Sequence, residues 1–165
     1  MEIKQLLGEY DCKIDAKGRM RMPSGLIAQL DGSDDSDNSS PSHTFVINRG
    51  FEKCLMLYPE PVWEKITAEI NQLNLYNKKN RNFVRYFYRG AHKVAMDSAD
   101  RILVTKRLLE YASIERDVIL SAYNDRIEIW AKDEYDRMMD EEPDDFSDLA
   151  EDVLGKSNNI ENTDL

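Results

Sequence analysis

The segment Ile14-Asp15-Ala16-Lys17-Gly18-Arg19-Met20-Arg21-Met22-Pro23 returns 82 positions later as Met96-Asp97-Ser98-Ala99-Asp100-Arg101-Ile102-Leu103-Val104-Thr105. In both copies an aspartate precedes an arginine by four positions. Further along the chain the offset falls to 72, where Leu55-Met56-Leu57-Tyr58 matches Ile127-Glu128-Ile129-Trp130. The difference of 10 positions fits one insertion in the first copy, over residues 31–42. Self-similarity at a fixed offset indicates a duplicated structural unit.

Local patterns predict the same plan for each copy. Strands at 10–14 and 20–22 flank a turn at Lys17-Gly18, because glycine accepts a positive φ. Pro23 favours the start of a helix that runs to Leu30. The first copy continues with strands at 44–47 and 54–58 and helices at 63–73 and 82–89. The second copy predicts strands at 94–96, 102–104, 118–123 and 126–130, and helices at 106–112 and 133–139.

The charge is distributed unevenly along the 165 residues. The net charge of −10 argues against a nucleic-acid partner only if the acidic residues are spread evenly. Residues 133–165 hold thirteen acidic and two basic residues, whereas residues 78–116 hold ten basic and four acidic ones. The acidity therefore belongs mostly to the tail, and the preceding sequence remains compatible with binding to DNA.

Other features bear on location and on chemistry. The two cysteines, Cys12 and Cys54, follow no secretory leader, which predicts a cytoplasmic protein with reduced thiols, and no apolar run is long enough to span a membrane. His43 and His92 are not spaced with the cysteines as zinc ligands are, and the sequence has no glycine-rich phosphate loop or nucleophile elbow. We therefore predict no enzyme, no metal, no cofactor and no small-molecule substrate.

Three motifs together resemble a known family. They are the Asp-x-Lys-Gly-Arg-x-x-x-Pro box at 15–23, the later Asp-x-x-x-Arg box at 97–101, and the stretch Arg-Gly-x-x-x-Cys-Leu-x-Leu-Tyr-Pro at 49–59. Over roughly residues 1–140 this pattern resembles the MraZ family of bacterial transcriptional regulators, which are built from two AbrB-like units. The resemblance implies control of cell-wall and division genes, and assembly into rings that bind tandem repeats upstream of the protein's own operon.

The resemblance and the duplication lead to one fold prediction. We expect an α+β, mainly β fold, in which tandem AbrB-like units form a pseudo-dimeric β-barrel capped by short helices. The first unit should span 1–76, with a mobile acidic loop at 31–43, and the second unit with its linking helix should span 77–140. We expect the acidic tail, 141–165, to be disordered.

The paired boxes are the candidate DNA-binding site. An arginine can contact guanine or a phosphate with two hydrogen bonds, and an aspartate at the base of the turn restricts its rotamers. The resemblance assigns this role to Arg19 and, with a departure, to Arg101, since Asp100 and Thr105 stand where the family usually has Gly and Pro. The turns should be supported by Asp15, Gly18 and Asp97. Phosphate contacts are expected from the surrounding basic residues Lys13, Lys17, Arg21, Lys106 and Arg107.

Alternatives remain at this point. The boxes could be surface ion pairs, or the fold could be a protein-interaction module that does not bind DNA. Arg81, Arg85 and Arg89 alternate with aromatic residues and could stack on nucleic acid, although a core role for Phe83 and Phe87 is the favoured interpretation. The tail could compete with DNA or maintain solubility. The prediction is a cytoplasmic, nucleoid-associated homo-oligomer that binds double-stranded promoter DNA, with a ring as the form that the resemblance implies.

Overall fold

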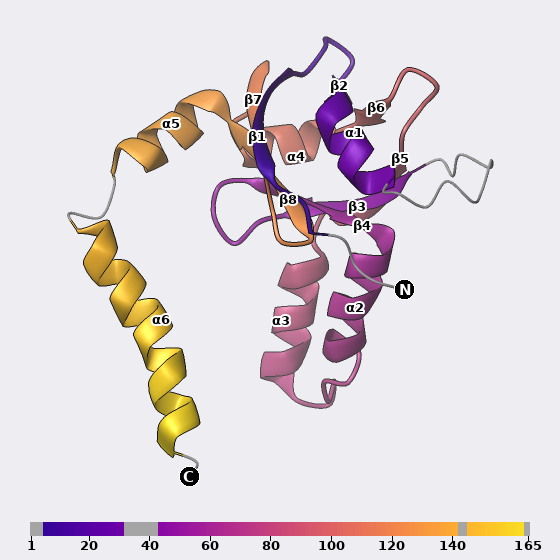
Figure 1. Ribbon diagram of the computed structural model, residues 1–165. Coiled ribbons are helices and arrows are strands. Elements are labelled where there is room, and N and C mark those ends of the chain that lie inside the picture. Colours follow the sequence, from indigo (N-terminus) through magenta and orange to yellow (C-terminus); the bar gives the residue numbers. More distant parts are fainter. Residues whose placement is uncertain (1–4, 32–42, 142–144, 164–165) are drawn as a thin grey trace. The chain divides into compact units, whose positions relative to one another are not determined.

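The computed structural model describes residues 5–31, 43–141 and 145–163 (Figure 1). The chain divides into two compact units, residues 1–132 and 133–165. The first unit contains β1 (Gly8–Lys13), β2 (Arg19–Arg21), α1 (Ser24–Asp31), β3 (Thr44–Arg49), β4 (Leu55–Pro59), α2 (Glu60–Ile70), α3 (Lys78–Tyr88), β5 (His92–Ala95), β6 (Arg101–Leu103), α4 (Lys106–Tyr111), β7 (Asp117–Tyr123) and β8 (Arg126–Ala131). The second contains α5 (Lys132–Asp140) and α6 (Phe146–Thr163).

The two halves of the first unit are interleaved in a six-stranded antiparallel sheet with the order β1-β7-β8-β4-β3-β5. Strand β1 of the first half pairs with β7 of the second, and β5 of the second half pairs with β3 of the first. At the centre, Met56 lies opposite Glu128, which is its own equivalent in the repeat. An approximate two-fold axis therefore passes between β4 and β8, and neither half forms its sheet alone.

A second, smaller sheet obeys the same symmetry. Strands β2 and β6 form a two-stranded antiparallel ribbon, in which Met20 lies opposite its equivalent Ile102. Both side chains are fully buried in the core. Because side chains alternate along a strand, the neighbours of Met20 and Ile102 must face outward. The ribbon thus has one apolar face and one exposed face.

The prediction of a closed β-barrel is not confirmed. In the described part of the chain the edge strands of the larger sheet, β1 and β5, each pair on one side only, with β7 and with β3. The strands that could have closed the sheet, β2 and β6, pair with each other instead. The α+β class is confirmed, and so is the duplicated plan, because equivalent strands occupy equivalent places about the axis.

The main core lies between the larger sheet, the ribbon and helices α1 and α4. Ile47, Leu57 and Leu120 project into it from the sheet, while Leu26 of α1 and Leu108 of α4 close it. Burying one such side chain contributes about 1.5–3 kcal/mol. The ribbon is therefore held against the sheet by the two buried residues on its axis, Met20 and Ile102.

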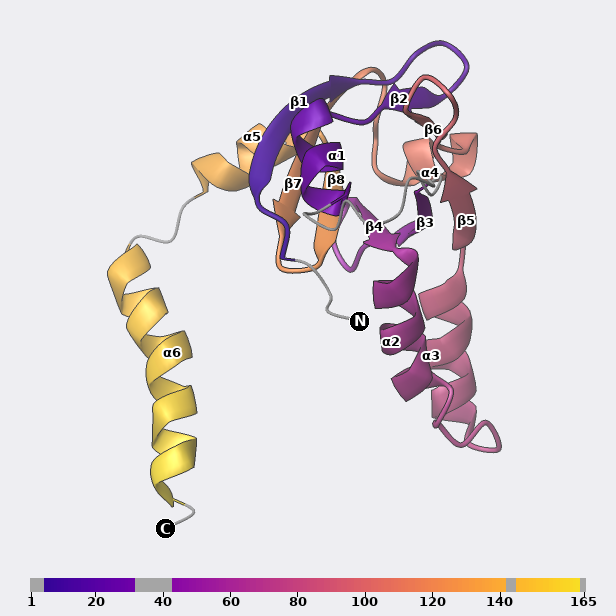
Figure 2. The same cartoon turned by 45° about the vertical axis from the view of Figure 1, so that its right-hand side comes forward.

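Helices α2 and α3 pack on the other face of the sheet. Trp63 of α2 lies with its ring centroid 5.6 Å from that of Tyr58 on β4, and the side-chain amide of Asn48 on β3 donates a hydrogen bond to the Phe87 carbonyl oxygen at 2.6 Å. Both helices project away from the β2–β6 ribbon (Figures 1 and 2). Helix α2 begins earlier than predicted, at Glu60, because Pro59 and Pro61 occupy positions where no backbone donor is needed.

Two predictions concern segments outside the strands. The predicted mobile loop at 31–43 falls mainly on residues 32–42, which lie outside the described residues. Within the tail that was expected to be disordered, Phe146–Thr163 form α6. Apolar residues recur there at helical spacing, and Asp145 Oδ1 accepts a hydrogen bond from the Asp148 N–H at 3.2 Å, as a helix cap does. Across the described residues, none of the helices is long and apolar enough to cross a membrane.

Candidate nucleic-acid interface

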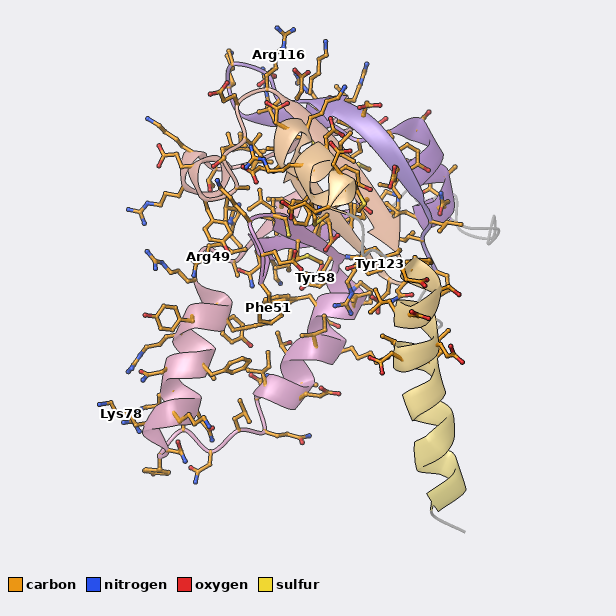
Figure 3. All side chains as sticks on the ribbon, turned by 90° about the vertical axis from the view of Figure 1, so that its left-hand side faces the viewer. Arg49, Phe51, Tyr58, Lys78, Arg116 and Tyr123 are labelled. Carbon is orange, nitrogen blue, oxygen red and sulfur yellow. The ribbon has the colours of Figure 1, made fainter. Side chains whose placement is uncertain are left out.

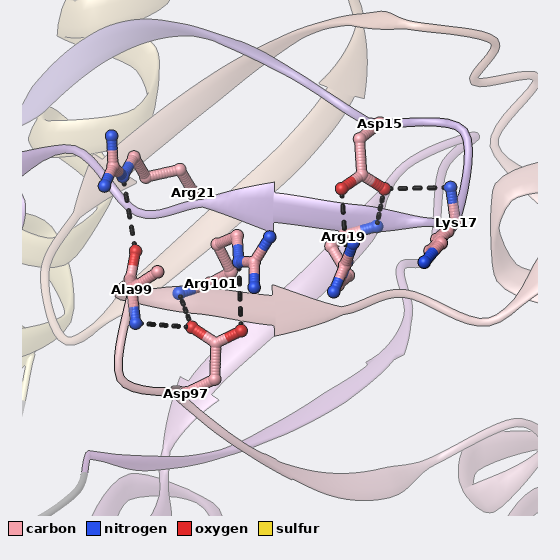
Figure 4. A network of polar contacts seen from close by, with 7 residues as sticks. All are labelled: Asp15, Lys17, Arg19, Arg21, Asp97, Ala99 and Arg101. Carbon is pink, nitrogen blue, oxygen red and sulfur yellow. Dashed lines mark hydrogen bonds and ion pairs between the residues drawn. The ribbon is translucent and has the colours of Figure 1, made fainter.

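The first Asp-x-x-x-Arg box is a tight turn built around one carboxylate (Figure 4). Asp15 Oδ1 accepts the backbone N–H groups of Lys17 and Arg19, both at 2.9 Å. Its Oδ2 accepts the Arg19 Nε–H at 3.2 Å. The turn is closed by the Gly18 N–H, which donates to the Asp15 carbonyl oxygen at 3.0 Å. One side chain thereby sets the path of the backbone and also the direction of the arginine.

The second box repeats these contacts. Asp97 Oδ1 accepts the N–H groups of Ala99 and Arg101 at 2.9 Å, and Oδ2 accepts the Arg101 Nε–H at 3.0 Å. Asp100 has φ 61° where Gly18 has φ 83°, so the departure from the usual glycine does not change the turn. Aspartate is among the residues that tolerate this left-handed region best. The second turn therefore retains its geometry and adds a negative charge at its tip.

The turns keep both aspartates charged. Hydrogen bonding from the Arg19 backbone N–H, more than any other contact, lowers the pKa of Asp15 below its ordinary value. The Arg101 backbone N–H does the same for the pKa of Asp97. A hydrogen bond to the charged form of a carboxyl group favours that form. Each arginine is consequently held by an ionised partner throughout the neutral pH range.

Three guanidinium groups share the outer face of the ribbon. Arg19 lies opposite Leu103 and Arg21 lies opposite Arg101 in the strand register. Arg19 and Arg101 are diagonal neighbours, so their Cα atoms are about 7–8 Å apart. The side chains of Arg19 and Arg101 are 31% and 34% exposed. The two arginines named from the sequence therefore face the same way and lie close together, although their turns stand at opposite ends of the ribbon (Figure 4).

Each of these arginines is anchored through Nε. Arg21 Nε donates to the Ala99 carbonyl oxygen at 3.2 Å, in the turn of the opposite copy. Within the described residues, the terminal Nη groups of Arg19, Arg21 and Arg101 have no protein acceptor. The paired donors that recognise a phosphate or a guanine thus remain available, while the stem of each side chain is fixed.

The other basic residues collect near the first turn. The Val104 N–H donates to the Gly18 carbonyl oxygen at 2.8 Å, which brings the start of α4, with Lys106 and Arg107, close to Lys17. Lys13 ends β1, one residue before Ile14, whose bridge to Met20 joins β1 to β2. All four basic side chains are exposed. The end of the ribbon with the first turn is therefore basic, whereas the other end carries Asp100.

One residue near this end was not singled out from the sequence. The Arg116 carbonyl oxygen accepts the Ile14 N–H at 2.8 Å, so an exposed arginine precedes β7 beside the first box (Figure 3). The two residues are 102 positions apart in the chain. The pairing of β1 with β7, which could not be read from either local segment, produces this proximity.

The arginines of α3 lie elsewhere. Arg81 Nη1 donates to the carbonyl oxygens of Leu75 and Tyr76 at 2.9 Å, which closes the loop before the helix. Phe87 stacks on Trp63 with centroids 5.6 Å apart, which agrees with a packing role for Phe87. Phe83 stacks on Phe87 but remains 45% exposed, so it belongs only partly to that core. Helix α3 points away from the ribbon and is not part of this interface.

Comparison with known proteins agrees with the duplicated architecture. The family model described as "MraZ protein, putative antitoxin-like" matches twice, at residues 5–86 and 87–156. The chain belongs to the MraZ family. The resemblance inferred from the three motifs is thereby confirmed, and the two matches correspond to the two halves that interleave in the sheet.

Individual MraZ relatives are similar over nearly the whole chain. A protein named transcriptional regulator MraZ from Flavobacterium psychrophilum is 41% identical over 157 residues, covering 94% of this chain and 96% of its own length. The protein of the same name from Christiangramia forsetii is 41% identical over 151 residues, covering 91% of this chain and 93% of its own length. The one from Cytophaga hutchinsonii is 36% identical over 147 residues, covering 89% of this chain and 93% of its own length. MraZ is a family of regulators, so the prediction of a non-enzyme is confirmed.

Proposed function

We propose that the protein is a sequence-specific, DNA-binding transcriptional regulator whose β2–β6 ribbon docks on double-stranded DNA. The observation that carries the proposal is the outer face of the ribbon, where Arg19, Arg21 and Arg101 are each anchored through Nε and present free Nη groups. The names of the MraZ relatives support the same role.

The geometry suits reading from the major groove. A two-stranded ribbon fits this groove, which displays guanine O6 and N7 as a pair of acceptors. Arg19 and Arg101 sit about 7–8 Å apart at their Cα atoms, so they can reach neighbouring base pairs. Their anchored stems lose little rotamer freedom on binding, because the turns have already ordered them.

The uneven charge of the ribbon orients it on the duplex. Lys17, Lys106 and Arg107, together with Lys13 and Arg116, would contact phosphates beside the first turn, and such contacts position a protein without reading sequence. Asp100 disfavours a close phosphate at the other end. The first box therefore serves as the principal contact and the second as the weaker one, with Arg21 adding a positive charge next to Ala99.

A single subunit is expected to bind weakly. Each two-point base contact discriminates by about 1–3 kcal/mol, whereas specific binding exceeds non-specific binding by about 4–10 kcal/mol. Linked subunits on short direct repeats make the later contacts intramolecular and supply the difference. The proposal therefore includes a homo-oligomer, in the form of a ring, at the promoter of a cell-wall and division gene cluster that contains the protein's own gene. It also includes a cytoplasmic, nucleoid-associated location.

Alanine substitution of Arg19 and Arg101, singly and together, tests the proposal. Binding to promoter DNA with short direct repeats is measured by fluorescence anisotropy at salt concentrations from about 50 to 200 mM. Each lost phosphate contact should reduce the slope of log K against log salt by about 0.9. Lost base contacts should lower the preference over scrambled DNA.

Lys65→Ala is the matched control, because it removes one exposed positive charge from α2, on the side away from the ribbon. We expect Arg19→Ala to weaken binding more than Arg101→Ala, and Lys65→Ala to leave it unchanged. Unaltered affinity and salt slope in the double arginine variant would remove DNA from the proposal, and would favour a protein partner for the same face.

A further inference from the structure

The outer face of the β2–β6 ribbon carries one apolar side chain beside its three arginines. Leu103 lies opposite Arg19 in the strand register, and its side chain is 53% exposed. The other outward positions of the paired residues are Arg21 and Arg101. A single leucine on a protein surface is ordinary. The position of Leu103 within the ribbon, rather than its exposure, is therefore the informative observation.

Leu103 lies against the first turn, next to Arg19. A Cβ atom at Gly18 would be 3.7 Å from Leu103 Cδ1, so the tip of the leucine reaches the turn. The Val104 N–H donates to the Gly18 carbonyl oxygen, so the next pair along the ribbon, Arg19 with Leu103, is a non-hydrogen-bonded pair. The Cα atoms of such a pair are about 4.5 Å apart and its side chains are close. The two side chains consequently stand next to each other on the proposed DNA-binding face.

The symmetry of the ribbon gives the second copy of this position a different chemistry. Arg21 is the equivalent of Leu103, 82 positions earlier in the chain. Its Nε donates to the Ala99 carbonyl oxygen of the second turn at 3.2 Å, just as Leu103 reaches Gly18 of the first turn. One backbone position thus carries a cation at one end of the ribbon and an alkyl group at the other. The two ends should therefore prefer different chemical groups on a duplex.

An alkyl group in the major groove has one matching partner among the bases. Thymine displays a C5-methyl group there, whereas the other three bases display hydrogen-bonding groups. Successive base pairs are about 3.4 Å apart, which is close to the separation of about 4.5 Å between the Cα atoms of Arg19 and Leu103. The two side chains can therefore reach adjoining base pairs. Contact between the leucine and the methyl group removes apolar surface of both from water, which favours the complex.

We infer that Leu103 is a specificity-determining residue, which recognises the C5-methyl group of a thymine next to the base that Arg19 contacts. The inference rests on the proposed docking of the ribbon in the major groove. It adds an apolar contact to the arginine contacts at the end of the ribbon that holds the first turn. The end that holds the second turn makes no such contact, because Arg21 occupies the equivalent position.

Replacing thymine by deoxyuridine tests the inference, because this change removes the methyl group and keeps the base pair. The probe is a promoter duplex with short direct repeats, in which each thymine is replaced in turn. Fluorescence anisotropy gives the affinity of the unmodified chain, of Leu103→Ala and of Leu75→Ala. Leu75 is the matched control, because its side chain is also 53% exposed and it lies between α2 and α3, away from the ribbon (Figure 1). Circular dichroism checks that both variants are folded.

The result is the coupling between the leucine and the methyl group. At one or more thymines of the repeat, loss of the methyl group should weaken binding of the unmodified chain and of Leu75→Ala by about fourfold, the factor that burial of one methyl-sized group contributes. Leu103→Ala should bind the thymine and deoxyuridine duplexes equally at those positions. The inference is overturned if the unmodified chain is insensitive to every replacement, or if Leu103→Ala keeps the same sensitivity.

Failure of the proposed function gives a different result. In that case the unmodified chain would bind the repeat duplex no better than scrambled DNA, whichever thymines are replaced, and the inference would be refuted together with the proposed function. Specific binding of the repeat duplex without any coupling between Leu103 and a methyl group would refute the inference alone.

Discussion

Gly18→Ala should destabilise the protein far more than the equivalent change in the other turn. Gly18 has φ +83°, and a Cβ atom there would lie 2.7 Å from the Val104 carbonyl oxygen. The left-handed backbone costs an alanine roughly 1–2 kcal/mol. Moving Val104 away strains its 2.8 Å hydrogen bond to the Gly18 carbonyl oxygen, whose net worth is about 0.5–1.5 kcal/mol. The expected loss is therefore about 1.5–3.5 kcal/mol.

The internal duplication supplies the control for this experiment. Asp100 already holds φ 61° with a side chain, so Asp100→Ala should cost less than about 1 kcal/mol. Urea unfolding followed by circular dichroism measures both variants, and the Gly18→Ala loss corresponds to a melting temperature lower by about 3–14 °C. A loss below 1 kcal/mol for Gly18→Ala, or equal losses for the two variants, would refute the argument that the first turn requires glycine.

Three further predictions concern protonation and packing. The folded state lowers the pKa of Asp15 and Asp97 from the ordinary 3.8, so the stability they contribute is complete above that pH and is lost as the pH falls through the lowered pKa values. The double Asp→Asn variant should therefore lose less stability on acidification than the unmodified protein, and an acid-unfolding curve identical to that of the unmodified protein would contradict this linkage. Burial raises the pKa of Cys12 to about 11 and that of Cys54 to about 12. Iodoacetamide at about pH 8 should therefore label the folded protein more slowly than free cysteine, whose pKa is near 8.5. Labelling at the rate of free cysteine would contradict the burial of these two thiols. Leu57→Ala, at a fully buried position of a central strand, should cost about 2–5 kcal/mol in urea unfolding, and a loss below that range would place Leu57 outside the core.

The symmetry of the fold bears on how the binding face could evolve. Because the approximate two-fold axis passes between Met20 and Ile102, every position on one strand of the ribbon has a symmetry-related position on the other strand. Arg21 and Leu103 are such a pair, and only one of them is charged. The face is therefore symmetric in its backbone and asymmetric in its charge.

Much of this architecture follows from chemistry that is local in the chain. The glycine at position 18, the aspartate four residues before each arginine, and the alternation or helical spacing of apolar residues each act within one turn or strand. They were enough to predict both boxes, the hairpin of β3 and β4, and helices α1, α4 and α5 within about a residue of their observed bounds, whereas α2 and α3 begin three and four residues earlier than predicted. The tail shows the limit, since its overall composition concealed the helical spacing of Phe146, Leu149 and Val153.

The arrangement in space depended on contacts between distant parts of the chain. β1 could have completed its sheet with β3 of its own half, and instead it pairs with β7, so that Gly8 lies opposite Ala122. Periodicity shows which face of a strand is buried but does not specify its partner. That choice left the sheet open, brought Arg116 beside the first box, and let Arg21 reach Ala99. Long-range pairing is settled by the fit of the whole core, and for that reason the full set of residues on the proposed binding face became visible only in the folded molecule.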